Sequence, residues 1–485
     1  MTNLLFLFTD EQKASTLAAY GNSKIQMPNL NRLAAEGCVF EKSYVTQPVC
    51  TPSRSSLLTG LYPHTNTCTA NNIPLPEQID CMPEMLPRDK YVTGYHGKRH
   101  LGDEIFRQHD FDEWRAIEDG YLKYYRPKRD RDARSSYYHF LVENGYQPGG
   151  GNTFSRGTCA RFQERYGKPA YLAGEASRFI RENKDDDFVL FVNFLEPHMP
   201  FHSPRNDQYD PEDVALPEDF NDVPTQDQHP KPRLLYKTYR ERGFDTFSLS
   251  SEISWRQIIS NYWGLCSLVD TYSGKILDTL RECGLYDDTV IVFTSDHGDM
   301  MGSHRLIAKG IMYEEAATVP MIVRMPGQEE PISFSEPVSQ IDLLPTLLDL
   351  LDERIPPGLQ GKSLKPVLEG ETGIEDDVFV EWNGPNTGVG KVFVEEGSTE
   401  DAVRAAVQDP IRTVITRDGW KFNCSPLGYH ELYNLKDDPH ETRNLALDPE
   451  NRPLMRELLG SIRKWQERTE DTVELPEDLT PTQLR

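Results

Sequence analysis

Short continuous runs of apolar residues recur along the first two thirds of the chain, and polar or charged residues follow each run. The clearest runs cover residues 4–9, 187–195 and 289–294, and residues 39–45 and 319–324 also favour strands. Unbroken apolar runs are typical of strands buried on both faces of a mainly parallel sheet. Helical apolar spacing covers residues 27–37, 252–283 and 339–351. We therefore predict an α/β fold with a large, mixed but mainly parallel sheet between helices.

The pattern changes beyond about residue 375. Short segments that favour antiparallel strands cover residues 378–382, 411–415 and 420–422, and a helix is predicted over about 450–468. We predict a main domain over 1–375, a small C-terminal α+β subdomain with an antiparallel sheet over 376–470, and a polar tail over 471–485. The tail is expected to be an extended wrap or disordered. Long loops are predicted for residues 103–180 and 203–250.

Composition and charge narrow the class of protein. The chain has 485 residues, 37% hydrophobic and 27% charged, which fits a soluble globular protein. Its net charge of −25 argues against nucleic acid as a partner. No apolar run approaches the roughly 20 residues that span a bilayer, so no membrane partner is expected.

Cysteine usage and the first residues suggest a compartment. Eight cysteines are scattered without a Cys-x-x-Cys pair, which predicts neither a disulfide framework nor a zinc site. The first eight residues have no basic segment and no small-residue cleavage site. We expect a reducing, cytoplasmic location, or a periplasmic or secreted one if a leader has been removed.

The stretch from Cys50 to Gly60 carries the strongest chemical signal. Pro52 suits the first position of a helix, and Gly60 is a plausible terminator. Cys50 is then predicted just before a helix N-terminus, where free N–H groups and the helix dipole favour an anion. Arg54 adds a permanent charge with fork geometry. A nucleophile beside an anion cradle is the minimum apparatus for attack on a sulfate or phosphate ester. The alternative is a buried cysteine beside an ordinary helix cap.

Candidate metal ligands directly follow two of the predicted strands. Asp10 comes after the first run, and Asp296 with His297 comes after the run at residues 289–294. Ligand sites in open α/β sheets lie at the carboxyl ends of strands. A carboxylate beside an imidazole is a plausible metal pair. For Asp10 a helix N-cap is an equal alternative.

These stretches together resemble the type I, formylglycine-dependent sulfatases of the alkaline phosphatase-like superfamily. The resemblance rests on Cys50-Thr51-Pro52-Ser53-Arg54 with the Leu-Thr-Gly ending, and on further matches in family order. Those are Gly97–Gly102, Pro197–Pro200, Ser295–Asp299, Gly302–Gly310 and Glu431–Leu445. The resemblance implies an alkaline-phosphatase-like sandwich and conversion of Cys50 to formylglycine by a formylglycine-generating enzyme. It makes the main domain the catalytic one.

The resemblance also implies roles for individual residues. Lys98 would hold the nucleophile and the sulfate oxygens, His100 would steer the aldehyde hydrate, His198 would assist the bridging ester oxygen, and Lys309 would clamp a sulfate oxygen. His304 is carried over as a substrate contact. Asn72, in the polar stretch beyond the signature helix, could also contact substrate, although an asparagine in a turn is the more common case. The chain departs from the usual motif at Arg99, where family members usually have Trp.

One divalent ion is expected from the same resemblance. Its ligands would be Asp10, Asp296, His297 and Glu11, the last at a position where many family members have a second Asp. Hard oxygen ligands favour Ca²⁺, and the imidazole leaves Mg²⁺, Mn²⁺ or Zn²⁺ open.

The predicted function is a sulfatase that removes sulfate from a sulfate monoester, with a small anionic sulfated sugar as the expected substrate. Aromatic residues in 103–180 could form a sugar-stacking wall, or could simply pack a surface excursion. A phosphonate monoester or phosphodiester hydrolase of the same superfamily is the first alternative. A catalytically silent sulfoglycan-binding protein with an unmodified Cys50 is the second. The oligomeric state stays open.

Overall fold

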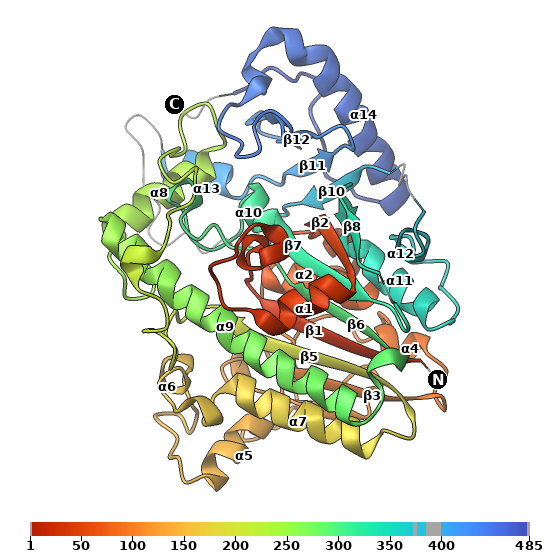
Figure 1. The fold of residues 1–485 in the computed structure, drawn as a ribbon. Helices are drawn as coiled ribbons and strands as arrows, with labels where there is room; N and C mark the ends of the chain where they lie inside the picture. Colours follow the sequence, from red (N-terminus) through yellow and green to blue (C-terminus); the bar gives the residue numbers. More distant parts are fainter. Residues whose placement is uncertain (1, 329, 372–375, 385–398, 483–485) are drawn as a thin grey trace.

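A mixed sheet lies at the centre of the computed structural model, which describes residues 2–328, 330–371, 376–384 and 399–482 (Figure 1). Within these residues its strand order is β4-β3-β5-β1-β6-β7-β2-β8, with β9 paired to β2. The strands are β1 (Asn3–Asp10), β2 (Cys38–Tyr44), β3 (Tyr91–Gly97), β4 (Glu113–Arg115), β5 (Asp187–Pro197), β6 (Thr289–Ser295), β7 (Thr318–Arg324), β8 (Ile332–Phe334) and β9 (Val338–Ser339). The five neighbours from β4 to β6 run parallel, whereas β7 is antiparallel to both β6 and β2.

Helices cover both faces of this sheet, as the unbroken apolar runs predict. In β1, Leu5 and Leu7 face one core and Leu4, Phe6 and Phe8 face the other. The first core is closed by α1 (Pro28–Glu36), α7 (Lys168–Glu182) and α9 (Glu252–Glu282), which lie in front of the sheet in Figure 1. The second is closed by α2 (Cys50–Thr59), α4 (Met82–Met85), α11 (Leu343–Leu350) and α12 (Lys365–Leu368).

A separate antiparallel sheet forms the C-terminal part of the described chain. Its order is β10-β11-β12-β13, with β10 (Val378–Glu381), β11 (Arg412–Ile415), β12 (Trp420–Cys424) and β13 (Glu431–Asn434). The apolar face of α14 (Arg452–Thr469) packs on it, with Trp465 stacked on Phe379 at 5.3 Å. This confirms the small α+β part of the predicted fold. The exact domain boundaries stay predictions.

The described part of the tail is an extended wrap. Asp471 pairs with the buried guanidinium of Arg412 at 2.7 Å, Leu479 is buried, and Thr482 N–H donates to Gly428 O at 2.8 Å. These contacts return the chain across the small sheet. For residues 471–482 these contacts fit the extended wrap.

Two predicted loops contain helices. The 103–180 stretch holds α5 (Ser136–Glu143), α6 (Arg156–Cys159) and most of α7, and the 203–250 stretch holds α8 (Pro230–Arg242). The prediction of a loop was wrong for α7. Its residues Leu172, Ala176 and Ile180 form an apolar stripe that packs in the core against the sheet and α9. The remaining short helices are α3 (Pro63–Asn66), α10 (Glu314–Ala317) and α13 (Glu400–Val407). Within the described ranges, no helix is long and apolar enough to cross a membrane.

Candidate active site

Parallel pairing of β5, β1 and β6 brings the predicted metal and acid residues together. Asp10 lies opposite Pro197, and Thr9 lies opposite Ser295. The carboxyl ends of these strands therefore deliver Asp10, Glu11, His198, Asp296 and His297 to one edge of the sheet, and each of these side chains is at least nine-tenths buried. The structure thus brings these predicted site residues together, and their individual roles stay predictions.

Cys50 enters the same place from the start of α2. It is the first residue of the helix, and Val49 is its extended N-cap, so Pro52 stands third rather than first. Gly60 ends the helix in the left-handed region at φ 67°, as predicted. Cys50 Sγ lies 3.3 Å from His297 Nε2 and 3.9 Å from Asp10 Oδ1.

The cysteine thiol itself is a poor nucleophile here. Burial, with Asp10 nearby, raises the pKa of Cys50 to about 12. Reactive cysteines instead have a lowered pKa and some exposure, because the thiolate is the reacting form. The setting of Cys50 favours a different chemical group at this position over thiolate chemistry.

The Arg54 guanidinium is hydrogen-bonded to the carboxylates of Asp10 and Asp296. Its Nη2 donates to Asp10 Oδ2 and its Nε to Asp296 Oδ2, both at 2.8 Å, and Nη1 donates to Lys98 O at 2.8 Å. The Lys98 ammonium pairs with the same Asp10 oxygen. Although burial alone would raise the pKa of Asp10, the cations of Lys98 and Arg54 hold it well below its usual range. Asp10 is therefore ionised.

Glu11 links the site to Lys309 and His198. Its Oε2 lies 2.6 Å from Lys309 Nζ and 3.3 Å from His198 Nε2, and its Oε1 is buried without a hydrogen-bond partner in the described chain. Burial raises the pKa of Glu11 to about 8. Burial and the neighbouring Lys309 hold the pKa of His198 well below its usual value, so this imidazole is neutral.

The donor atoms left over fit a divalent cation. Arg54 occupies the Oδ2 atoms of Asp10 and Asp296, so their Oδ1 atoms are the ones that face Cys50 and His297. His297 Nδ1 lies 2.9 Å from Gly298 O, which fixes its proton there and leaves the Nε2 lone pair for a metal. Asp10, Cys50, Asp296 and His297 form one candidate ligand group, and Asp10, Glu11 and His198 form another.

His100 and Asn72 meet beside the start of α2. His100 Nε2 lies 3.0 Å from Asn72 Oδ1, and Asn72 N donates to Thr51 Oγ1 at 3.1 Å, one residue from Cys50. The ring of Tyr121 lies over His100 with centroids 4.6 Å apart. The structure thus brings Asn72 and His100 together, and one aromatic residue of the 103–180 stretch joins them. Their predicted roles stay predictions.

His304 lies in a different environment. Its Nδ1 is 2.7 Å from Asp222 O and its Nε2 is 3.3 Å from Asp219 Oδ2, while its ring stacks on Tyr313 at 4.3 Å. None of these contacts joins His304 to the Cys50 cluster. Its predicted role in substrate binding stays a prediction, and its contacts indicate that it ties the segment after β6 to residues 219–222.

Arg156, from α6, was not predicted from the sequence. Its guanidinium binds Glu118 and Tyr121, and its Nη1 lies 3.4 Å from His198 Nδ1. Lys168 pairs with the same Glu118 at 2.8 Å. A clue was available, because Arg156 lies in the aromatic stretch from which a sugar-binding wall was expected.

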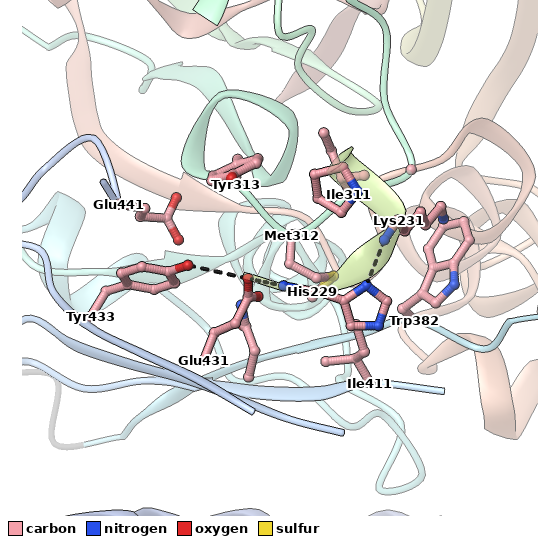
Figure 2. A pocket seen from close by; sticks show the side chains of 13 residues that line it. His229, Lys231, Ile311, Met312, Tyr313, Trp382, Ile411, Glu431, Tyr433 and Glu441 are labelled. Atoms are coloured by element: carbon pink, nitrogen blue, oxygen red, sulfur yellow. Dashed lines mark hydrogen bonds between the residues drawn. The ribbon is translucent and has the colours of Figure 1, made fainter. Parts of the chain in front are cut away.

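A small cavity lies beside Gly310, between the start of α8 and the C-terminal sheet (Figure 2). Lys231 Nζ lies 3.3 Å from the centroid of the Trp382 ring and has no hydrogen-bond partner among the described residues. Burial lowers the pKa of Lys231 well below its usual value. Glu441, on the opposite wall, is not a partner for the Lys231 amine, because it pairs with Lys421 at 2.8 Å.

Comparison with known proteins identifies the family. The family model named Sulfatase matches residues 2–353. An ulvan-active sulfatase of Formosa agariphila is 26% identical over 480 residues, which cover 95% of this chain and 80% of that protein. A phosphonate monoester hydrolase from Silicibacter pomeroyi superposes with a TM-score of 0.78 at 22% identity, covering 97% of this chain and 96% of that one.

A further structure, solved in complex with its substrate D-glucosamine-2-N,6-O-disulfate, superposes with a TM-score of 0.75 at 23% identity, covering 97% of this chain and 98% of that one. The two structural likenesses show that the fold is the alkaline-phosphatase-like α/β sandwich. Because the family model covers well over half of the sequence, the chain belongs to the sulfatase family of sulfuric ester hydrolases.

Proposed function

We propose that this protein removes sulfate from a sulfate monoester on a small or chain-terminal sugar, using a formylglycine formed from Cys50 and one divalent ion. The observation that carries the proposal is the position of Cys50 at the buried start of α2, beside the carboxylate of Asp10 and among the cations of Arg54, Lys98 and Lys309. A formylglycine hydrate at this position would supply the hydroxyl nucleophile that the thiol cannot.

Asp10, Asp296, His297 and Glu11 would hold the metal. Ca²⁺ is our first choice because three of these four side chains offer hard oxygen ligands. When bound, the ion would polarise the sulfuryl oxygens and lower the pKa of a coordinated hydroxyl. The unpartnered Oε1 of Glu11 supports its inclusion, because a buried carboxylate oxygen without a partner is costly.

The remaining residues position the sulfate group and the leaving oxygen. Lys98 and Lys309 flank Cys50 and offset the equatorial negative charge of the reacting group. Arg54 keeps Asp10 and Asp296 in place through its fork. His198 and Lys309, which both contact Glu11 Oε2, are the residues that would interact with the bridging oxygen. His100 and Asn72 orient the group at position 50.

A sugar fits this site better than a long polyanion. The cationic side chains form one compact cluster in a protein of net charge −25, so an extended anion would be repelled elsewhere. Tyr121 supplies an aromatic face over His100. The names of the relatives that act on ulvan and on a glucosamine disulfate support a carbohydrate substrate.

One experiment addresses the nucleophile. Mass spectrometry of the Cys50 peptide should show the mass of formylglycine, and Cys50→Ala should abolish turnover of 4-nitrophenyl sulfate while the far-UV spectrum is retained. Cys283→Ala, at the end of α9, is the matched control and should keep activity. Turnover by Cys50→Ala at the level of the control would refute the proposal.

A second experiment addresses the substrate. We would measure kcat/KM on sulfated mono- and disaccharides, aryl sulfates, phosphonate monoesters and phosphodiesters. A sulfated sugar is expected to give the highest value. If phosphonates or phosphodiesters exceed every sulfated sugar, the protein is instead a hydrolase of the first alternative class. If Cys50 stays unmodified and the protein binds sulfated sugars but hydrolyses none of these esters, it is the silent binding protein.

A further inference from the structure

The imidazole ring of His198 lies between the guanidinium of Arg156 and the carboxyl of Glu11. Arg156 Nη1 is 3.4 Å from His198 Nδ1, and the opposite edge of that ring is 3.3 Å from Glu11 Oε2. Arg156 is 29% exposed whereas His198 is 8% exposed, so Arg156 stands nearer to solvent. A substrate group that extends outward past His198 would meet this guanidinium.

Protein contacts hold the guanidinium in one orientation but do not use all of its hydrogens. Nε donates to Glu118 Oε1 at 2.7 Å, and Nη2 donates to Glu118 Oε2 and to the Tyr121 hydroxyl. His198 Nδ1 lies 2.8 Å from Met199 O, a carbonyl that can only accept, so Nδ1 carries the proton. It cannot accept from Arg156, so the two hydrogens of Nη1 have no acceptor among the described residues.

The local charge is positive. Glu118 is shared by two cations, Arg156 and Lys168. Although burial alone would raise the pKa of Glu118, these two cations hold it well below its usual range, so it contributes one full negative charge. Two other carboxyls interact with this cluster: burial raises the pKa of Glu196 to about 7, and Asp10 is already paired with Arg54 and Lys98. The cluster beside His198 therefore carries surplus positive charge in a strongly acidic protein.

We propose that Arg156 binds a second anionic group of the substrate, a carboxylate or a second sulfate, on the sugar that carries the scissile ester or on its neighbour. This inference rests on the proposed function and makes it more specific. A guanidinium fixed by Glu118 and Tyr121 loses little further freedom when it binds an oxyanion. The substrate class is thus a sugar that bears two negative charges, only one of which is removed.

The test compares pairs of substrates that share the scissile ester and differ only in the second charge. One pair is a sugar monosulfate and its disulfate, and the other is a monosulfated neutral disaccharide and its uronic acid analogue. The wild-type protein should favour the doubly charged member by at least about tenfold in kcat/KM. The pair that shows the larger ratio separates sulfate from carboxylate as the second group.

Variants then assign that ratio to Arg156. Arg156→Met should lower the ratio by about tenfold or more, and Arg156→Lys should lower it less, because the charge is kept but the fork is lost. Arg161→Met removes an exposed arginine two residues beyond α6 and should leave the ratio unchanged. Far-UV spectra would verify folding, and Arg156→Gln replaces the methionine variant if it does not fold.

The inference is overturned if the wild-type ratio is near one for both pairs, or if Arg156→Met and Arg161→Met give the same ratio. This failure differs from a failure of the proposed function, which would show as preference for another ester class. In that event the ratio would be measured on phosphonates or phosphodiesters with and without the second charge. The test still applies, because the two members of each pair share the same scissile bond.

Discussion

Replacing Arg54 by methionine should destabilise the fold itself. The guanidinium is 1% exposed and bridges Asp10 and Asp296, both fully buried, at 2.8 Å. Removing one partner of a buried ion pair leaves an uncompensated charge and costs about 3–5 kcal/mol. Lys98 still neutralises Asp10 and the Glu11 N–H still donates to Asp296, so we expect a value inside that range and not the sum of two pairs.

The acidity of Asp10 gives this prediction a second readout. A carboxyl whose pKa is lowered on folding contributes stability above its unfolded pKa of about 3.9, and this contribution is lost as the pH falls through the folded value. Loss of Arg54 raises the folded pKa of Asp10. The stability difference between wild type and Arg54→Met should therefore be full near pH 7 and should shrink below about pH 4.

Urea unfolding in the presence of a chelator, followed by the fluorescence of the six tryptophans, measures the effect without a contribution from bound metal. Arg404→Met is the matched control: it removes an exposed helix pair with Glu400 and should cost only about 0.3–0.5 kcal/mol. Equal losses in the two variants, or a loss in Arg54→Met that does not change with pH, would refute the reasoning.

Three further predictions concern other parts of the fold, each measured by urea unfolding. Gly97→Ala should prevent stable folding, because Gly97 has φ 115° and a Cβ there would lie 1.9 Å from Asn193 O; a stable variant contradicts the close approach. Asp471→Ala should cost about 3 kcal/mol by leaving Arg412 buried without its partner, and no change would mean that the tail does not wrap the small sheet in solution. Lys231→Met should stabilise the protein by about 1 kcal/mol or more at pH 7. Because burial lowers the pKa of Lys231, this gain should fade as the pH approaches about 10.4, and a gain that grows with pH would exclude burial of the ammonium as its cause.

The sequence identifies those parts of the site that follow from strand order. Asp10 and Asp296 each end a buried apolar run, and parallel pairing of neighbouring strands then brings them to one edge without further information. Cys50 and Arg54 are one turn apart on a helix, so their joint orientation is also local. For these residues the pattern along the chain already contains the geometry.

Arg156, which the sequence did not identify, and the surroundings of His304 depend on contacts between distant segments. Arg156 belongs to a four-residue helix without periodicity, and its orientation is set by Glu118 and Tyr121, which lie more than thirty residues earlier. His304 follows a family pattern, yet Asp219 and Asp222 engage it from a segment more than eighty residues away. Propensity and spacing carry no information about such partners.

The complete burial of α2 constrains when its first residue can be altered. Cys50 is 2% exposed, all ten residues of the helix are buried, and its contact with His297 spans 247 positions of sequence. During synthesis at about 5–20 residues per second, His297 is added roughly 12–50 seconds after Cys50. If Cys50 is converted to formylglycine, as we propose, the modifying enzyme must bind the flanking residues during that interval, or before β6 inserts beside β1. Afterwards the substrate of that enzyme lies inside a finished core, so chains that miss the interval are expected to persist as a folded, unmodified population.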